Sequence, residues 1–550
     1  MQYLRLFERL FREIFVILQS LHFLQRKTMK SFNTAGTCRP NEHYMVDITD
    51  RLEIIRKMVA KGDYFCINRG RQYGKTTTLR NLKRYLEDKG YSVFYISFET
   101  FDEFYFETDE KLGSAFLNSL CWCLQQGLVF NTTHDAVFDL LYFRDRHEQS
   151  CPLRLLSQQL QLYTSTNAHP VVLLIDEVDQ ASNFHSFIKL LGMLRDMYIQ
   201  SDDFKPFQSV ILSGVYDIKN LKLRIRTEEE HQYNSPWNIA VPFDVDMSLS
   251  AKGIAGMLAE YKADHNLTFD EVFVAQMIRD YTAGYPFLVS RICQIIDAEQ
   301  YTWDKEGVLK AVNKILGEGS TLFDDIVKKL DEFPELELTI RGVLFNGDRY
   351  PFNYYDKATN LALMFNFVKQ QDGALAVACR MFEIWFYNFF LYKEKTTPAF
   401  QQGMIEKSQF IHDGILDIPH LLERFVVHMN QTYKMDHDNE FIENDARKIF
   451  LTYLRPVING IGSYHIEEQT RDHDRMDVVI DYLGKQYVIE LKIWRGNAYN
   501  ERGEEQLCRY LEYFDLQEGY LLSFCFNKTK RSGLLPPVEL NGRTLIEAIV

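Results

Sequence analysis

One short segment constrains the fold of this 550-residue chain more than any other. The apolar run from Tyr64 to Asn68 is typical of a buried strand. It is followed directly by Arg-Gly-Arg-Gln-Tyr-Gly-Lys-Thr, residues 69–76, and then by a helical pattern that continues to about Asp88. The segment therefore predicts a strand, a glycine-bearing loop and a helix in immediate succession.

A loop of this kind suits a triphosphate, because its backbone N–H groups and the N-terminus of the new helix face the anion. Lys75 is placed to reach the outer phosphates and Thr76 to ligate magnesium. The full P-loop pattern has glycine at its first position, where this chain has Arg69, and an ordinary helix start is the alternative interpretation. The expected ATP-binding residues of the loop are Arg69, Gly70, Arg71, Gln72, Tyr73, Gly74, Lys75, Thr76 and Thr77.

Three further strands are predicted at residues 91–98, 171–175 and 210–214, and they alternate with helices as in a doubly wound α/β sheet. Asp176 and Glu177 end the second of these strands, at the sheet edge where ligands bind. We expect Asp176 to hold magnesium through water and Glu177 to polarise the water that attacks the terminal phosphate. Ser213, at the end of another strand, is a candidate sensor of that phosphate. The alternatives are a solvated pair of acids and an ordinary strand-end hydroxyl.

These residues resemble the bacterial and archaeal AAA-ATPase-like family, whose P-loops often read Arg-x-Arg-x-x-Gly-Lys-Ser/Thr, as Arg69 and Arg71 do here. The resemblance continues through residues 235–243 and 284–289. It implies an ATPase core over 40–248 and a helical lid over 249–324, and it is compatible with a homo-oligomer. It also implies that Arg291, in the lid, contacts the bound nucleotide.

The middle of the chain, residues 325–395, predicts a winged-helix-like unit. Helices are expected over 334–345 and 355–367, followed by a hairpin over 368–377 that turns at Asp372-Gly373. The second helix is poor in Arg and Lys, which favours a packing or regulatory role over DNA binding. Residues 396–435 are expected to form a helical linker.

The segment from Arg475 to Lys492 contains two β-rich runs joined by a short turn, which predicts a hairpin. A turn at Leu483-Gly484 sets Asp477 opposite Glu490, and a turn one residue later sets it opposite Lys492. Glu490 and Lys492 share one face of their strand in either case. Two carboxylates and a lysine at one place can hold Mg2+ or Mn2+ and orient water for phosphodiester hydrolysis.

This constellation resembles the PD-(D/E)XK nuclease superfamily, with Met476 standing at the position of the proline, and it implies a restriction-endonuclease-like α/β domain over 436–550. The resemblance assigns catalytic roles to Asp477, Glu490 and Lys492, with Asp477 and Glu490 as metal ligands. In one exonuclease-like branch, the positions of Gln506 and Tyr510 help to hold metal ligands and DNA. Glu443 matches a further metal-proximal glutamate, and Asp445 competes for that role.

Charge, cysteines and hydropathy limit the setting of the protein. The formal net charge of -14 argues against bulk electrostatic coating of nucleic acid. Nine scattered cysteines fit a reduced cytoplasmic setting. Residues 1–39 are expected to form an N-terminal extension. One interpretation is an amphipathic helix that docks on the body of the protein or on a lipid surface; the other is that Met29 is the natural start and the residues before it are dispensable. Charged residues interrupt its apolar run, so no membrane segment is predicted.

Together these features predict an ATP-hydrolysing switch that controls a metal-dependent DNA nuclease, with defence against foreign DNA suggested by analogy alone. The alternative is a nucleotide-dependent binding or signalling protein whose C-terminal fold recognises nucleic acid or protein without cutting. The sequence leaves open DNA versus RNA, end versus internal cutting, sequence preference, the activating signal and the number of subunits.

Overall fold

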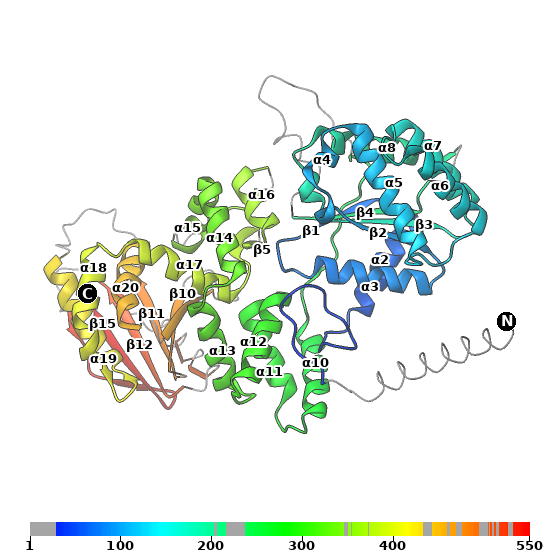
Figure 1. Ribbon diagram of the computed structural model, residues 1–550. Coiled ribbons are helices and arrows are strands. Elements are labelled where there is room, and N and C mark those ends of the chain that lie inside the picture. Colours follow the sequence, from blue (N-terminus) through cyan, green and yellow to red (C-terminus); the bar gives the residue numbers. More distant parts are fainter. Residues whose placement is uncertain are drawn as a thin grey trace, which may run out of the picture.

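Figure 1 shows the path of the chain from a P-loop sheet at one end of the molecule to a second sheet at the other, with helices between them. The computed structural model describes residues 29–202, 206–215, 237–345, 350–353, 355–371, 373–432, 443–458, 462–468, 476–483, 485–493, 504, 507–508, 511–512, 516–525 and 532–550. The described part of the expected N-terminal extension is therefore 29–39. Within these ranges, no helix combines the length and the hydropathy needed to cross a membrane.

The first sheet is parallel and contains the four strands predicted from the sequence, which confirms a P-loop α/β fold. Its strands are β1 (Phe65–Asn68), β4 (Ser209–Gly214), β3 (Val171–Asp176) and β2 (Ser92–Ser97), in that spatial order. Val241 adds a parallel bridge to Phe65 on the outer side of β1. Because the strands are parallel, their carboxyl ends meet at one edge, where β1 leads into the loop of residues 69–74.

Both faces of this sheet are buried, since successive side chains of its strands enter two different cores. Val93 packs in the core formed with helices α2 (Thr49–Lys61) and α3 (Lys75–Asp88), and Phe94 packs in the core on the other face. That second face is covered by α5 (Asp109–Gln125), α7 (Leu153–Thr166) and α8 (His185–Ile199), with α4 (Glu103–Phe106) and α6 (His134–His147) beside them. Burial on both faces explains why the strands are apolar throughout.

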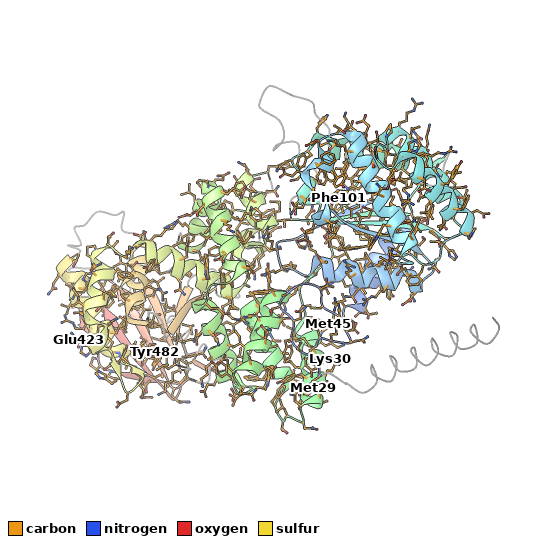
Figure 2. The ribbon with its side chains drawn as sticks, viewed as in Figure 1. Met29, Lys30, Met45, Phe101, Glu423 and Tyr482 are labelled. Carbon is orange, nitrogen blue, oxygen red and sulfur yellow. The ribbon has the colours of Figure 1, made fainter. Side chains whose placement is uncertain are left out.

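A helical lid follows the sheet. It consists of α10 (Ala251–Asp264), α11 (Glu271–Thr282), α12 (Pro286–Ala298) and α13 (Lys305–Gly317). The chain before α2 docks on this lid: Phe32 packs 5.0 Å from Tyr261 between ring centroids, and Lys30 forms an ion pair with Glu260 at 2.5 Å. Figure 2 labels Lys30 and Met45 beside these helices.

The middle unit contains the helices and hairpin that the sequence predicted. Its elements are α14 (Thr321–Glu332), α15 (Pro334–Phe345), α16 (Lys357–Met364), β5 (Val368–Gln371), β6 (Ala374–Val377) and α17 (Arg380–Lys393). Gln371 pairs with Ala374, as a turn at Asp-Gly requires. Helix α16 is shorter than the expected 355–367, because Asp356 caps its start by accepting from the Thr359 amide at 2.7 Å, and Asn366 adopts a left-handed φ of 57° after its end.

Helix α17 connects the middle unit to both of its neighbours. Its buried side chains include Phe382, Phe386 and Phe390, and they belong to one apolar core that runs from the lid into the C-terminal unit. The sequence is aromatic on more than one face, as expected of a helix buried all round. This continuous core joins the lid to the C-terminal unit.

The C-terminal unit is a mixed sheet with helices on both faces. The residues expected as a linker form α18 (Pro398–Glu406), the short strands β7 (Ile411–His412) and β8 (Ile415–Leu416), and α19 (Ile418–Thr432). Helix α18 packs on α20 (Glu443–Ile458), where Gly403 lies so close to the Tyr453 carbonyl that an added Cβ would stand 2.1 Å from it. These helices are thus part of the packed unit.

The second sheet has the order β13-β15-β12-β11-β10-β9, with β14 on β15. The strands are β9 (Gly462–Glu468), β10 (Met476–Tyr482), β11 (Lys485–Ile493), β12 (Glu518–Phe524), β13 (Gly533–Leu534), β14 (Val538–Leu540) and β15 (Arg543–Ile549). Strands β9, β10 and β11 are antiparallel, whereas β11, β12 and β15 are parallel. Between β11 and β12, residues 504, 507–508 and 511–512 are helical.

Candidate functional site

The loop between β1 and α3 has the backbone that a phosphate site needs. Gly74 adopts a left-handed conformation, φ 78°, immediately before α3 begins at Lys75. Because Gly74 has no side chain, it cannot cap the helix, and the first N–H groups of α3 are not bonded by a capping side chain. The N-terminus of α3 therefore presents uncapped donors and the positive end of the helix dipole at this point.

Lys75 is buried inside this loop. Its Nζ donates to the carbonyl oxygens of Arg69, at 3.0 Å, and Gly70, at 3.1 Å, so the lysine folds back on the loop. Burial lowers the pKa of Lys75, and the carboxylates of Glu177, Asp179 and Asp176 act in the opposite direction. The lysine therefore faces the acidic end of β3.

Asp176 and Glu177 differ in their surroundings. Asp176 is 1% exposed, accepts from the Tyr95 hydroxyl at 2.9 Å and accepts from the Glu177 amide at 3.1 Å, which fixes its side chain. Glu177 has a left-handed φ of 53° and a pKa raised by burial, with Lys75 opposing that rise. An acid that is fixed in place suits metal positioning, and an acid whose pKa is raised suits proton acceptance.

Ser213 lies at the same sheet edge, on the strand between β1 and β3. It pairs with Ile67, and its hydroxyl is fully buried without a hydrogen-bond partner among the described residues. A buried polar atom with no partner is costly, and a ligand oxygen would satisfy it. The strand-end position agrees with the sequence, and the phosphate-sensing role of Ser213 stays a prediction.

Other residues of the loop face neighbouring segments. Arg69 donates to the Val245 carbonyl at 3.1 Å, and Tyr73 packs edge-on against Tyr285, 4.7 Å between centroids. Gly70 lies against the middle unit, where an added Cβ would stand 2.8 Å from the Phe365 carbonyl oxygen. Thr76 is partly exposed beside Lys75, and Thr77 Oγ1 accepts from the Cys38 amide at 3.2 Å.

A cavity of about 590 Å3 opens beside this loop, between α3, the lid and the chain before α2. Gln72, Tyr73, Gly74 and Thr77 line it on the loop side, and Arg291 lines it on the lid side. Its volume is in the range that small-molecule and cofactor sites occupy. Arg291 does not stand alone there: its Nη2 lies 2.6 Å from Glu318 Oε1, and its Nη1 donates to Gln294 at 2.7 Å.

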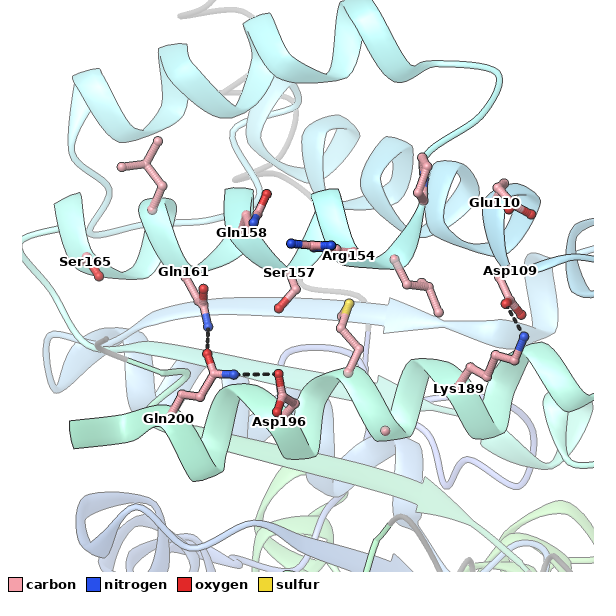
Figure 3. Close-up of a pocket in the computed structure, with 15 residues that line it drawn as sticks. Asp109, Glu110, Arg154, Ser157, Gln158, Gln161, Ser165, Lys189, Asp196 and Gln200 are labelled. Atoms are coloured by element: carbon pink, nitrogen blue, oxygen red, sulfur yellow. Dashed lines mark hydrogen bonds and ion pairs between the residues drawn. The ribbon is translucent and has the colours of Figure 1, made fainter. Parts of the chain in front are cut away.

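A larger hollow, of about 1070 Å3, lies between α5, α7 and α8 on the opposite face of the sheet (Figure 3). Several of its polar groups bind one another: Lys189 pairs with Asp109 at 2.5 Å, and Gln161 donates to Gln200 at 3.1 Å. None of its lining residues belongs to the loop of 69–77. The smaller cavity is therefore the candidate nucleotide site.

In the C-terminal sheet, the first of the two possible hairpin registers is the one found. Asp477 pairs with Glu490 and Tyr482 pairs with Lys485. Lys492 Nζ lies 3.6 Å from Glu490 Oε1, and the exposed fractions of the two side chains are 1% and 0%. The backbone of Asp477 is thus paired with that of Glu490, and the Glu490 and Lys492 side chains are buried.

Several predicted residues of this second site lie outside the described residues. Gln506 and Tyr510 are among them, and Glu443 and Asp477 are described by their backbone alone. Within the side chains that the structure does describe, no group of three or more His, Cys, Asp or Glu residues is arranged to hold a metal. The metal-binding role predicted for Glu443, Asp477 and Glu490 stays a prediction.

The structure adds three functional candidates that the sequence analysis missed. Tyr95 holds Asp176, and Asp179 accepts from the Val215 amide at 2.5 Å at the end of β4. Glu318 holds Arg291. Tyr95 had a readable signal, because the two-residue period that buries Val93 on the α3 side continues to Tyr95 on that side. The other two contacts depend on tertiary packing.

A parallel sheet with a glycine-bearing loop at the N-terminus of α3 and paired acids on a neighbouring strand defines a P-loop nucleoside triphosphatase fold. The AAA-like domain family matches residues 38–388, which is more than half of the chain, and the chain belongs to this family. No curated protein sequence matches it.

Among solved structures, the chain is similar to the Walker-type ATPase PABY2304 of Pyrococcus abyssi, at 13% identity and a TM-score of 0.44 over 63% of this chain and 97% of that one. It is also similar to CDC6p from Pyrobaculum aerophilum, at 12% identity and a TM-score of 0.30, over 64% and 94% of the two chains. The ORC1 protein of Aeropyrum pernix, solved in complex with DNA, gives 12% identity and a TM-score of 0.28, over 64% and 94%. Likeness at this level carries no argument about function.

Proposed function

We propose that the protein is an ATP-binding and ATP-hydrolysing switch whose nucleotide state controls its C-terminal unit. The observation that carries this proposal is the meeting of Lys75, Asp176 and Glu177 at the carboxyl edge of the sheet. The 590 Å3 cavity is lined by the adjoining Gly74 and Thr77, and by none of these three residues. A triphosphate at this edge would offer phosphate oxygens to the uncapped N–H groups of α3 and to Lys75. We expect Ser213, whose buried hydroxyl has no partner among the described residues, to contact the terminal phosphate, which ADP lacks.

The residues of the chain divide the work of hydrolysis. The N-terminal amides of α3 and Lys75 bind and orient the phosphates, and Glu177 accepts the proton of the attacking water. Thr76 and Asp176 would hold Mg2+, which supplies neutralisation of the phosphate charge. Because Tyr95 fixes Asp176, the metal-side acid is held in place before the nucleotide arrives.

For the C-terminal unit we propose Mg2+- or Mn2+-dependent cleavage of a phosphodiester, with DNA as the substrate. The pairing of Asp477 with Glu490 and the 3.6 Å approach of Lys492 support this proposal. The chain order also supports it: three antiparallel strands, β9, β10 and β11, follow α20, and helical residues at 504, 507–508 and 511–512 precede β12, so the strands that carry Asp477 and Glu490 have helical residues before and after them. Asp477 and Glu490 would hold the metal, and Lys492 would orient or deprotonate the water. A role in defence against foreign DNA rests on analogy alone.

A second candidate function is nucleotide-dependent binding without cutting. The observation that favours it is the burial of Glu490 and Lys492, at 0% and 1% exposure, which pairs the acid with the base and shields both from solvent. Under this proposal, the same strand pair stabilises the sheet, and the C-terminal unit recognises nucleic acid or protein when ATP is bound.

Cleavage of linear and circular DNA with Mg2+ or Mn2+, with and without ATP, separates the two candidates. The nuclease proposal predicts cutting by the wild-type chain and none by Glu490→Gln or Lys492→Ala. The control is Glu539→Gln, which removes an exposed carboxylate from β14 of the same sheet. Thermal unfolding of each variant checks that the sheet still forms. Absence of cutting by the folded wild-type chain, together with ATP-dependent DNA retention, refutes the nuclease and supports the binding function.

A further inference from the structure

The connection between α13 and α14 touches both sides of the nucleotide cavity. Glu318 follows directly after α13, and its carboxylate accepts from Arg291 Nε at 3.0 Å and from Nη2 at 2.6 Å. Both side chains are about one quarter exposed, at 28% and 27%, so the pair is partly shielded from solvent. The lid arginine that faces the cavity is thus occupied by an acid of the same chain.

The next residues of this connection reach the phosphate loop itself. Gln72 Nε2 donates to Thr321 Oγ1 at 2.8 Å, and Arg71 Nε lies 3.6 Å from Asp325 Oδ1. Glu318, Thr321 and the loop residue Gln72 all line the same cavity. Glu318, just before α14, thus contacts the lid, while Thr321 and Asp325, in the first turns of α14, contact the loop.

These contacts engage the side chains of Arg291, Gln72 and Arg71, which can also donate hydrogen bonds to phosphate. A guanidinium forms charge-assisted, bidentate hydrogen bonds with phosphate as readily as with a carboxylate. A triphosphate entering the cavity also brings several negative charges toward Glu318, and like charges within a few ångströms repel. Arg291 cannot satisfy both partners fully, so phosphate and Glu318 compete for it.

We infer that Glu318, Thr321 and Asp325 form an autoinhibitory clamp on the nucleotide cavity, and that a bound triphosphate opens this clamp by taking over Arg291. The inference rests on the proposed nucleotide site and names how that site is regulated. Release of Glu318 frees the start of α14, which belongs to the unit that includes α17. Since α17 shares its core with the C-terminal unit, opening the clamp is the first movement that ATP sends toward that unit.

The test is the affinity of the full-length chain for ATP with Mg2+, measured by calorimetry. Glu318→Gln keeps the size of the side chain but removes its charge, and the clamp predicts that it binds ATP about five-fold more tightly than the wild type, the equivalent of about 1 kcal/mol. Glu299→Gln is the matched control, since it breaks a lid ion pair, with Lys314 at 2.6 Å, at a residue that does not line the cavity. Its affinity is expected to equal that of the wild type.

A second variant and a second measurement distinguish opening of the clamp from a folding defect. Asp325→Asn weakens the contact with the exposed Arg71 and is expected to raise ATP affinity about two-fold at most. Hydrogen exchange in α14 should rise when the wild type binds ATP and should already be raised in Glu318→Gln without it. Unchanged or weaker ATP binding by folded Glu318→Gln overturns the clamp alone. A wild-type chain that binds no ATP overturns the nucleotide site, and the clamp with it.

Discussion

The contact between the lid and the C-terminal sheet gives the most quantitative prediction. Tyr281, on α11, donates its hydroxyl to Asp481 Oδ2 on β10 at 3.1 Å, and the two side chains are 3% and 1% exposed. Burial raises the pKa of Asp481, and Arg380, whose guanidinium stacks 4.4 Å from the Tyr281 ring centroid, opposes that rise. The hydrogen bond from Tyr281 in the lid therefore replaces part of the hydration that the Asp481 carboxylate loses on burial.

Tyr281→Phe removes this donor without changing the packing of the ring. A hydrogen bond to a charged group contributes about 1.5–3 kcal/mol, and here the acceptor stays buried after the change. We expect the local stability of β10 to fall by about 2 kcal/mol, which corresponds to roughly 30-fold faster exchange of its slowest amides. Because a chain of several units does not unfold in one step, residue-resolved hydrogen exchange is the appropriate assay.

Two comparisons isolate the cause. Tyr392→Phe removes the hydroxyl of an exposed tyrosine on α17 and should leave β10 unchanged. In an Asp481→Asn background, Tyr281→Phe should cost no more than about 1 kcal/mol, because the acceptor is then neutral. Equal exchange rates in β10 of Tyr281→Phe and the wild type would refute the reasoning, since they would show that the contact contributes nothing to docking.

Three further predictions concern the ATPase half. Lys75→Ala should weaken ATP binding by at least about tenfold in calorimetry, because a buried cation that faces the phosphates is lost; full affinity would contradict its role. Glu177→Gln should bind ATP but not hydrolyse it, and since burial raises the pKa of Glu177, the wild-type kcat should be lost as the pH falls through a value above that of an ordinary glutamate; an acid limb at or below the ordinary value counts against this base. Gly284→Ala should lower the melting temperature, because φ is +73° and the added Cβ would stand 2.2 Å from the Leu249 carbonyl oxygen; an unchanged melting temperature would show that this turn relaxes freely.

Local features of the sequence predicted local structure well. The strand, loop and helix over 64–88 could be predicted because an apolar run, a glycine-bearing loop and a helical pattern follow one another directly in the sequence. The hairpin of β10 and β11 was also readable, but its register was not, because both turns gave a sensible pairing; the structure places the turn at Leu483, which adopts a left-handed φ of 48°.

Contacts between residues far apart in the chain could not be predicted from the sequence. Tyr281 and Asp481 are 200 positions apart, and nothing in either segment identifies the other. Arg291 was predicted to face a nucleotide, yet its ion pair with Glu318 depends on how α12 and α13 pack. Similarly, the amphipathic pattern of residues 396–435 indicated helices but not the surface on which they pack.

Under the functions proposed above, one chain carries two separate sites for divalent-ion chemistry, one at each end of the molecule. Anomalous diffraction from crystals soaked with Mn2+ and a non-hydrolysable ATP analogue tests both sites at once. We expect one Mn2+ peak beside Thr76 and Asp176 and a second between Asp477 and Glu490, with only the second lost in Glu490→Gln. A single peak at the loop end, with none on β10 and β11, would contradict it.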